Sequence, residues 1–202
     1  QALETMTLRA TQVVSASAIG VYPDSLTTLY KEDYPGKADN FLGDVVVKWE
    51  ASVDQFEKLG IDVAKIRIGL VLSEKGGALP QIQKVVENYV GSPLGSGKQW
   101  QSWIHIEDLA RVFIFAIHKN LDGVFNGVAP NPVSNKKLTY AIAKIVGKPI
   151  FLPKVPAFVL KTVLGERSTL VLSSQLVSNS KLDALGFVYY FDHIGPALEN
   201  LL

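Results

Sequence analysis

The segment 11–50 constrains the fold of this chain more than any other part of the sequence. It opens with Thr11–Ser17, a run of apolar and β-branched residues that gives way to small polar ones. This profile is typical of a buried parallel strand whose carboxyl end opens into a ligand site. Ser15, Ser17 and Tyr22 lie at that end, which is where open α/β sheets hold their ligands.

An amphipathic helix is predicted after a polar, turn-rich excursion over Pro23–Asn40. This helix covers Asn40–Leu59 and stops near Gly60. Its apolar residues recur at the spacing of one helical face and are Leu42, Val45, Val46, Trp49, Val53 and Phe56. A second buried strand, Asp62–Leu72, follows and is interrupted by Arg67 and Gly69. The order strand, helix, strand predicts parallel neighbours joined by a right-handed crossover, and therefore an α/β fold.

Helical and strand patterns alternate over the rest of the chain. Glycine and proline punctuate them at the positions where helices begin and end. The expected elements are a helix end at Gln1–Arg9, a helix around Pro80, a short edge strand at Trp100–Ile106, a helix at Ile106–His118, a strand at Gly123–Val128, a helix at Leu138–Val146, a strand fragment at Ile150–Leu152, and helices at Pro156–Leu164 and His193–Leu202.

Composition excludes several classes of function. The 202 residues are enough for one α/β domain, with or without a small appendage, and 48 % of them are apolar. The net charge is +1 and no basic run occurs, so nothing indicates a nucleic-acid partner. No stretch is apolar enough to predict a membrane span. The chain contains no cysteine and its three histidines are scattered, which argues against thiolate catalysis and a metal site.

The beginning of the sequence carries no initiator methionine and no signal-peptide pattern. The Gly-rich G-x-G-x-x-G turn that commonly follows the first strand of a dinucleotide-binding fold does not occur. We therefore expect the chain to be the second part of a larger domain or a processed product.

Several motifs together resemble one protein family. Ser15-Ala16-Ser17 with Tyr22 is similar to the strand-end signature of extended short-chain dehydrogenase/reductases. An atypical branch, the YfcH-like epimerase family, is resembled by the following segments: Lys48-Trp49-Glu50, Arg67 to Leu72 with Gly76-Gly77-Ala78-Leu79, Gly95-Ser96-Gly97, Trp103 to Leu109, Asn126 to Pro130, and the tail from Leu164 to Phe187. The stretch Pro23–Tyr34 more closely resembles the eukaryotic, organellar members.

The resemblance covers nearly the whole chain and implies a Rossmann-type parallel sheet with a small mixed C-terminal substrate subdomain. It implies that residues 1–72 belong to the NADP-binding domain, that 98–128 return to its core, and that 76–97 with 129–202 form the smaller subdomain. The cofactor is expected to be NADP, with its Gly-rich loop lying before Gln1. A mitochondrial location, on the matrix side, is implied by the resemblance alone, with the cytoplasm as the alternative.

Catalysis in the parent superfamily uses Ser, Tyr and Lys, and the Tyr passes a proton to the substrate oxygen. Ser17 matches the position of the serine, whereas Leu42 and Val46 stand where the Tyr and Lys are expected. Lys48 cannot substitute, because it lies about 200° round the helix from Val46. Tyr22 is either a displaced proton donor or a packing or substrate contact. Ser17 is either catalytic or a hydroxyl that caps the strand or touches the cofactor.

The resemblance implies two further groups of site residues. The expected cofactor contacts are Ser15, Ala16, Ser17, Arg67 and Val71, and the expected substrate-pocket residues are Gly76, Gly77, Trp103 and His105. Each also has a structural interpretation. A lone Arg67 inside an apolar strand needs a partner, either an anionic ligand or an internal acid such as Glu50.

Other candidate residues carry the same ambiguity. Val71 is a strand-core candidate, and His105 is read as a structural histidine rather than a substrate contact. Trp100 and Trp103 are lid aromatics or ordinary packing residues. Asp108 is read as a first-turn helix acid.

Three functions remain open at this point. The first is an NADP(H)-dependent oxidoreductase or nucleotide-sugar epimerase-like enzyme of unknown substrate. The second is an NADP-binding protein with little or no catalysis. The third is a structural subunit that packs against protein partners in a larger mitochondrial assembly. The missing Tyr/Lys pair favours the second and third, whereas the retained pocket motifs favour the first two.

Overall fold

A parallel sheet forms the centre of the molecule in the computed structural model, which describes residues 10–165 and 168–202. Its strands are β1 (Gln12–Ala18), β3 (Asp62–Ile68) and β7 (Gly123–Gly127), in the order β1-β3-β7. In the register of this sheet Ser17 pairs with Arg67, and Arg67 pairs with Asn126 on the other side. The predicted α/β class with a parallel sheet is confirmed.

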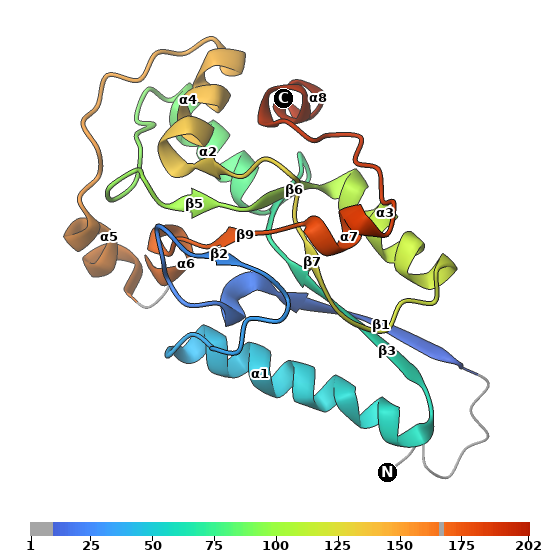
Figure 1. Ribbon diagram of the computed structural model, residues 1–202. Helices are drawn as coiled ribbons and strands as arrows, with labels where there is room; N and C mark the ends of the chain where they lie inside the picture. The colour runs from blue at the N-terminus through green and yellow to red at the C-terminus, as the bar shows by residue number, and fades with distance from the viewer. Residues whose placement is uncertain (1–9, 166–167) are drawn as a thin grey trace.

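Helices cover both faces of this sheet. Helix α1 (Phe41–Val53) runs along one face, and α3 (Ile106–His118) lies on the other (Figure 1). Because side chains alternate along a strand, Ser15 and Ser17 face α1 while Val14 packs into the apolar cluster beneath α3. The layer under α1 is therefore polar and the layer under α3 is apolar.

The second strand is split at Gly69, so the prediction of one strand over Asp62–Leu72 is wrong. Gly69 is the last residue held by β7, since its N–H donates to Gly127 O, and the next N–H, of Leu70, donates to Ser102 O. From there β4 (Leu70–Leu72) pairs in parallel with β6 (Trp103–His105). A Cβ on Gly69 would lie 2.1 Å from Ser102 O, so this change of partner requires a glycine.

Helix α1 is shorter than predicted, because a 3₁₀ segment, η3 (Asp54–Leu59), takes over its last turns. The helix begins after Asn40, whose Oδ1 accepts a hydrogen bond from Gly43 N. Its buried residues are Gly43, Val46 and Glu50. The predicted apolar face is thus partly wrong: Val45 and Trp49 are each 41 % exposed, because an acid that serves the polar layer occupies the inward position.

A second layer of helices packs around Trp103 and Leu72 at the far end of the sheet. It consists of α2 (Ala78–Glu87), α4 (Asn135–Val146) and α8 (Ile194–Leu201). These helices confirm the helical predictions in their regions, although α4 begins three residues earlier than expected and Tyr89 lies beyond α2. Helix α5 (Ala157–Leu164) is also confirmed, with Gly165 just past its end.

Several short elements were not predicted. They are β2 (Leu29–Tyr30) paired with β9 (Leu176–Val177), the strand β8 (Val133–Ser134), which pairs with β5 (Trp100–Gln101), and the short helices η2 (Ile19–Val21), α6 (Ser168–Leu172) and α7 (Ser180–Ala184).

Two strand predictions fail. The edge strand expected over Trp100–Ile106 is divided into β5 and β6, and Ile150–Leu152 is not a strand. The helix end expected at Gln1–Arg9 lies outside the described residues. Among residues 10–165 and 168–202, no helix is long and apolar enough to cross a membrane.

Candidate functional site

A cleft of about 230 Å³ opens at the carboxyl ends of β1 and β3. This is the edge at which open α/β sheets bind ligands. Its walls come from the strand ends, from α1, from β5 and from the region of α6, and every lining residue is uncharged. The lining residues are Ala18, Ile19, Gly20, Asn40, Leu42, Val46, Ile68, Gly69, Leu70, Trp100, Gln101, Ser102, Thr169, Ser173 and Gln175.

Leu42 and Val46 form part of the cleft wall on the α1 side. These are the positions at which the resemblance would place a catalytic Tyr and Lys. Val46 is 5 % exposed and also packs into the small core around Tyr22 and Tyr30. Positions 42 and 46 of α1 therefore face the cleft, but they carry apolar side chains where proton transfer would need titratable groups.

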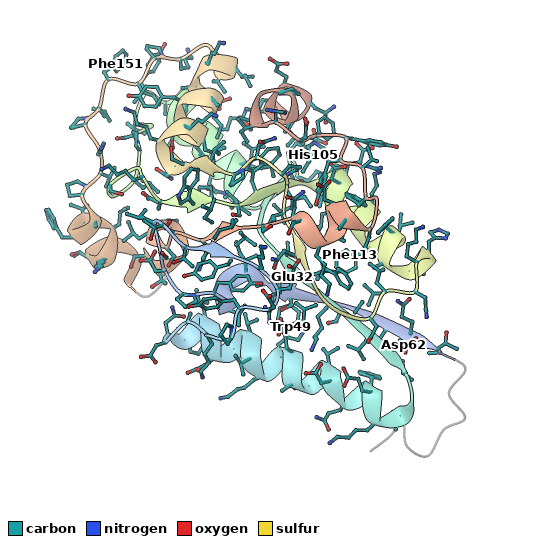
Figure 2. All side chains as sticks on the ribbon, viewed as in Figure 1. Glu32, Trp49, Asp62, His105, Phe113 and Phe151 are labelled. Atoms are coloured by element: carbon teal, nitrogen blue, oxygen red, sulfur yellow. The ribbon has the colours of Figure 1, made fainter. Side chains whose placement is uncertain are left out.

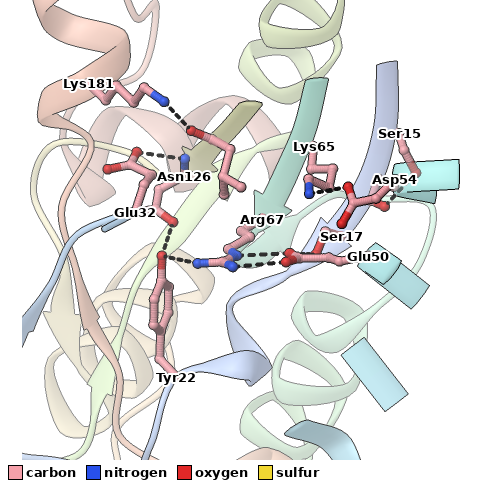
Figure 3. A network of polar contacts seen from close by, with 12 residues as sticks. Ser15, Ser17, Tyr22, Glu32, Glu50, Asp54, Lys65, Arg67, Asn126 and Lys181 are labelled. Carbon is pink, nitrogen blue, oxygen red and sulfur yellow. Dashed lines mark hydrogen bonds and ion pairs between the residues drawn. The ribbon is translucent and has the colours of Figure 1, made fainter. Parts of the chain in front are cut away.

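A buried polar network lies directly beside the cleft (Figure 3). Arg67 on β3 makes a two-pronged ion pair with Glu50 on α1, in which Nε donates to Oε1 at 2.8 Å and Nη2 donates to Oε2 at 2.9 Å. The third guanidinium nitrogen, Nη1, donates to the Tyr22 hydroxyl at 3.0 Å. The internal acid suggested from the sequence as one partner for Arg67 is thus the partner that the structure shows.

The hydroxyls of the two predicted catalytic residues belong to this network. Ser17 Oγ donates to Glu50 Oε1 at 2.5 Å, and Tyr22 Oη donates to Asn126 Oδ1 at 2.8 Å. Ser17 is 2 % exposed and Tyr22 is fully buried, and neither lines the cleft. The network joins them to each other through Arg67 and Glu50, and their catalytic roles stay predictions.

The charges in this network stabilise one another. Burial alone would raise the pKa of Glu50, but hydrogen bonds from Arg67 and Ser17 outweigh it and hold that pKa below its ordinary value. For Tyr22 burial dominates and raises its pKa, in spite of the hydrogen bond from Arg67. A tyrosine with a raised pKa is a weaker acid, so this environment does not activate Tyr22 as a proton donor.

A second ion pair lies one step further along the same helix and strand. Lys65 on β3 pairs with Asp54 at the start of η3. The acids are four residues apart and the bases two, which corresponds to about 6 Å along a helix and about 6.6 Å along a strand. This matched spacing of Glu50 and Asp54 with Lys65 and Arg67 is a signal that the sequence carries and that our prediction did not use.

The other predicted cofactor contacts lie on strands but do not line the cleft. Ser15 and Ala16 are half-buried in β1, and Ser15 Oγ donates to the Ala16 carbonyl oxygen at 2.9 Å. Val71 is half-buried in β4 and packs on the apolar cluster beneath α3. Their neighbours Ala18 and Leu70 are the ones that reach the cleft, so the predicted contacts of Ser15, Ala16 and Val71 with a cofactor stay predictions.

The predicted substrate residues are not gathered around this cleft. Gly76 and Gly77 precede α2, and Gly77 has the positive φ of 79° that a glycine tolerates. Trp103 is fully buried in β6, and its Nε1 donates to Asn131 O at 2.9 Å. None of these residues lines the cleft, and their contact with a substrate stays a prediction.

His105 makes structural contacts at the start of α3, and its predicted contact with a substrate stays a prediction. Its Nδ1 accepts a hydrogen bond from Glu107 N, its Nε2 lies 3.2 Å from Asn200 Oδ1, and its ring stacks on Phe191 with centroids 3.9 Å apart. Figure 2 shows His105 between α3 and the C-terminal part of the chain. Burial lowers its pKa in spite of Asn200, Asp108 and Glu107, which raise it.

Several cleft residues had escaped the sequence prediction. Gln101, Thr169, Ser173 and Gln175 come from β5 and from the region of α6, far from α1 in the sequence. Single polar residues in short, irregular segments carry no motif, so only the fold brings them to the cleft.

A parallel sheet with helices on both faces and a cleft at the carboxyl ends of its strands defines a Rossmann-like fold, of the kind found in short-chain dehydrogenase/reductases and sugar epimerases. The solved structure of the human epimerase family protein SDR39U1 (isoform 2) with NADPH matches 95 % of this chain with 32 % identity and a TM-score of 0.86. The nucleoside-diphosphate sugar epimerase of Corynebacterium glutamicum matches 97 % of it with 31 % identity and a TM-score of 0.78.

Sequence comparison gives the same direction. An epimerase family protein of Staphylococcus epidermidis is 41 % identical over 189 residues, which are 93 % of this chain and 63 % of that relative. The family model of a domain of unknown function, DUF1731, matches residues 155–201. The chain is thus similar over most of its length to epimerase family proteins.

The matches do not extend over the whole of the relatives. The chain spans 63 % of the Staphylococcus epidermidis protein, 65 % of the human structure and 38 % of the Corynebacterium glutamicum structure. The Staphylococcus relatives do not confirm the eukaryotic organellar branch or the mitochondrial location that the resemblance implied.

Proposed function

We propose that this chain forms the nicotinamide-facing and substrate-facing part of an NADP(H)-binding atypical short-chain dehydrogenase/reductase. The observation that carries the proposal is the uncharged cleft at the carboxyl ends of β1 and β3, with Leu42 and Val46 in its wall. It is supported by the human relative, which was solved with NADPH and matches 95 % of the length of this chain.

The strand ends fit the nicotinamide end of such a cofactor. Gly20 lines the cleft, and a Cβ placed on it would meet nothing within 4 Å, so open space begins at this backbone. Ala18, Ile19 and Leu70 would supply apolar contact for an uncharged ring, and the cofactor would supply the capacity for hydride transfer. In this proposal Ser15, Ala16, Ser17, Arg67 and Val71 support the cleft from behind, and residues 1–72 with 98–128 form the cofactor-binding part.

The alternative is a protein that binds the dinucleotide without turnover, or that serves as a structural subunit with protein partners. The observations that favour it are the apolar side chains at positions 42 and 46, together with the hydroxyls of Ser17 and Tyr22, which are buried and hydrogen-bonded within the protein. The compartment stays a prediction, in which the bacterial relatives favour the cytoplasm over the mitochondrial matrix.

The test is a titration of the full-length protein with NADPH, followed by the fluorescence of the reduced nicotinamide. We expect enhanced emission, and we expect Gly20→Leu to abolish it by filling the cleft. Gly195→Leu is the matched control, because a Cβ there also meets nothing within 4 Å but Gly195 lies on α8. NADPH emission that is unchanged by the wild-type protein would refute the proposal. Loss of NADPH absorbance at 340 nm over time would distinguish an enzyme from a protein that binds the dinucleotide without turnover.

A further inference from the structure

The cleft combines apolar walls with a few uncharged hydrogen-bonding groups at its outer end. Trp100 and Gln101 on β5, and Thr169, Ser173 and Gln175 near α6, lie across from the strand ends that the proposed function assigns to the nicotinamide. A cleft of about 230 Å³ is small beside the roughly 300–1,000 Å³ of common ligand pockets. An occupant of the outer end is therefore small.

Two side-chain amides of the lining, Asn40 before α1 and Gln101 on β5, can donate hydrogen bonds to an occupant of the cleft. Asn40 Oδ1 is used to cap α1, which leaves the Asn40 NH₂ as a donor. Gln101 lines the cleft, and within residues 10–165 and 168–202 no hydrogen bond from its side-chain amide to the protein is found. Neutral amides donate to carbonyl oxygens without supplying a proton that can be lost.

The lining offers no acid to a reacting oxygen. Among the described residues that line the cleft, none has a side chain that titrates near neutral pH, and the phenol of Tyr22, which does not line it, is buried and donates to Asn126. Reduction of a simple ketone or sugar carbonyl needs a proton at the oxygen as the hydride arrives. A conjugated acceptor does not, because the anion formed is delocalised.

We propose that the outer end of this cleft binds small, planar, uncharged conjugated carbonyl compounds of the quinone class. Trp100 and the apolar wall would contact the ring, and the amides of Gln101 and Asn40 would donate to its oxygens. This proposal rests on the proposed function for its chemistry: the nicotinamide C–H bond breaks, its hydrogen and two electrons pass to the quinone, NADPH becomes NADP⁺, and the hydroquinone anion takes its proton from water.

Binding can be tested without turnover, using menadione as the probe and tryptophan fluorescence as the readout. We expect saturable quenching that Trp100→Phe largely removes. Trp49→Phe is the matched control, since Trp49 is 41 % exposed on the outer face of α1, and it should leave the quenching unchanged.

Gln101→Glu tests the amide, because it keeps the shape of the side chain and places a carboxylate beside the quinone oxygen. We expect menadione to bind at least about 10-fold more weakly, which corresponds to about 1.4 kcal/mol, while Gln55→Glu, on the exposed side of η3, has no effect. Ser173→Phe, which fills the outer end of the cleft, should give the same loss if Gln101→Glu proves unstable.

Quenching that does not saturate, or that survives in both Gln101→Glu and Ser173→Phe, would overturn the proposal. So would a change in Trp100 emission with UDP-glucose but not with menadione, because it would assign the cleft to a nucleotide sugar. The NADPH titration is independent of this readout. Menadione binding without NADPH binding would refute the proposed function but support the quinone site. NADPH binding without menadione binding would support the proposed function and refute the quinone site.

Discussion

Arg67 donates hydrogen bonds to both carboxylate oxygens of Glu50, and this contact connects β3 to α1 (Figure 3). The two side chains are only 12 % and 11 % exposed, so the pair is nearly dry. The same guanidinium reaches Tyr22, and the same carboxylate accepts from Ser17. One ion pair thus fixes the helix that carries Leu42 and Val46 relative to the strand ends that form the opposite wall.

Removal of one charge from this pair should destabilise the fold strongly. Glu50→Gln leaves a buried guanidinium without its counter-charge, and we expect a loss of about 3–5 kcal/mol in the free energy of unfolding. Urea denaturation measures it. Asp44→Asn is the matched control, because Asp44 lies on the same helix and pairs with Lys37, which precedes the helix; both side chains are 56 % exposed, so the change should have little effect.

The double variant Glu50→Met with Arg67→Met separates charge from packing. A buried pair that is replaced by apolar residues of similar length often restores much of the stability that a single removal costs. We expect the double variant to be more stable than Glu50→Gln. If the double variant is less stable than Glu50→Gln, the ion pair does more than neutralise its own two charges. The hydrogen bonds of Ser17 and Tyr22 to this pair would then also contribute to stability.

His105 should make stability depend on pH. Its pKa in the folded protein lies below the ordinary value of 6.5, so the unfolded chain binds the proton more readily. The stabilising effect of neutral His105 is therefore complete above about pH 6.5 and is lost as the pH falls through the folded pKa. Protonation also removes Nδ1 as the acceptor for Glu107 N.

His105→Asn should flatten this part of the pH profile, since asparagine can still cap α3 but does not titrate. The measurement is urea denaturation between about pH 5 and 8. His118→Asn serves as the control, because His118 is exposed at the other end of the same helix. If the dependence of the unfolding free energy on pH persists in His105→Asn and disappears in His118→Asn, the effect comes from His118 and the prediction is wrong.

The sequence was sufficient for the parallel sheet, for α3 and α4 and for the position of the cleft at the end of β1, because strong periodicity and glycine stops carry that information. It was not sufficient for the face of α1. Hydrophobic spacing counted Val45 and Trp49 as inward, whereas Glu50 occupies the inward position through its contact with Arg67.

The prediction of the site was limited for a related reason. The sequence pattern of a hydroxyl at a strand end does not show whether it faces a ligand or a buried carboxylate. In the structure Ser17 faces Glu50. The far wall could not be predicted either. Gln101, Ser173 and Gln175 are brought to the cleft by short segments whose pairing depends on the whole fold.

Two glycines at the cleft should differ strongly in their response to the same substitution. Gly69→Ala would bring a Cβ to 2.1 Å from the backbone oxygen of Ser102, so β4 and β6 would have to separate, and we expect a loss of about 3 kcal/mol, the upper end of the usual cost of overpacking. At Gly20 the added methyl group meets nothing within 4 Å, and stability should change by less than about 0.5 kcal/mol. Thermal unfolding of the two variants side by side tests the change of strand partner at Gly69. Equal melting temperatures would contradict it.

Asp108 should prove to be the anchor of the C-terminal segment rather than only a first-turn helix acid. It is fully buried, and its two carboxylate oxygens accept from Tyr190 N and Phe191 N, each at 2.9 Å, while Arg111 contacts it from the next turn. Both acceptor positions are needed at once. Asparagine offers one oxygen and one NH₂ group, so Asp108→Asn must leave one backbone N–H facing another donor.

We therefore expect Asp108→Asn to cost about 1–3 kcal/mol in the free energy of unfolding, the range for a buried donor that loses its partner. Glu107→Gln is the matched control, because it removes an exposed charge from the same helical turn without touching the C-terminal segment. Hydrogen exchange gives the decisive measurement. The amides of Tyr190 and Phe191 should exchange faster in Asp108→Asn alone, and if Glu107→Gln accelerates them equally, the effect belongs to the charge at the start of α3 and not to the carboxylate that holds residues 190 and 191.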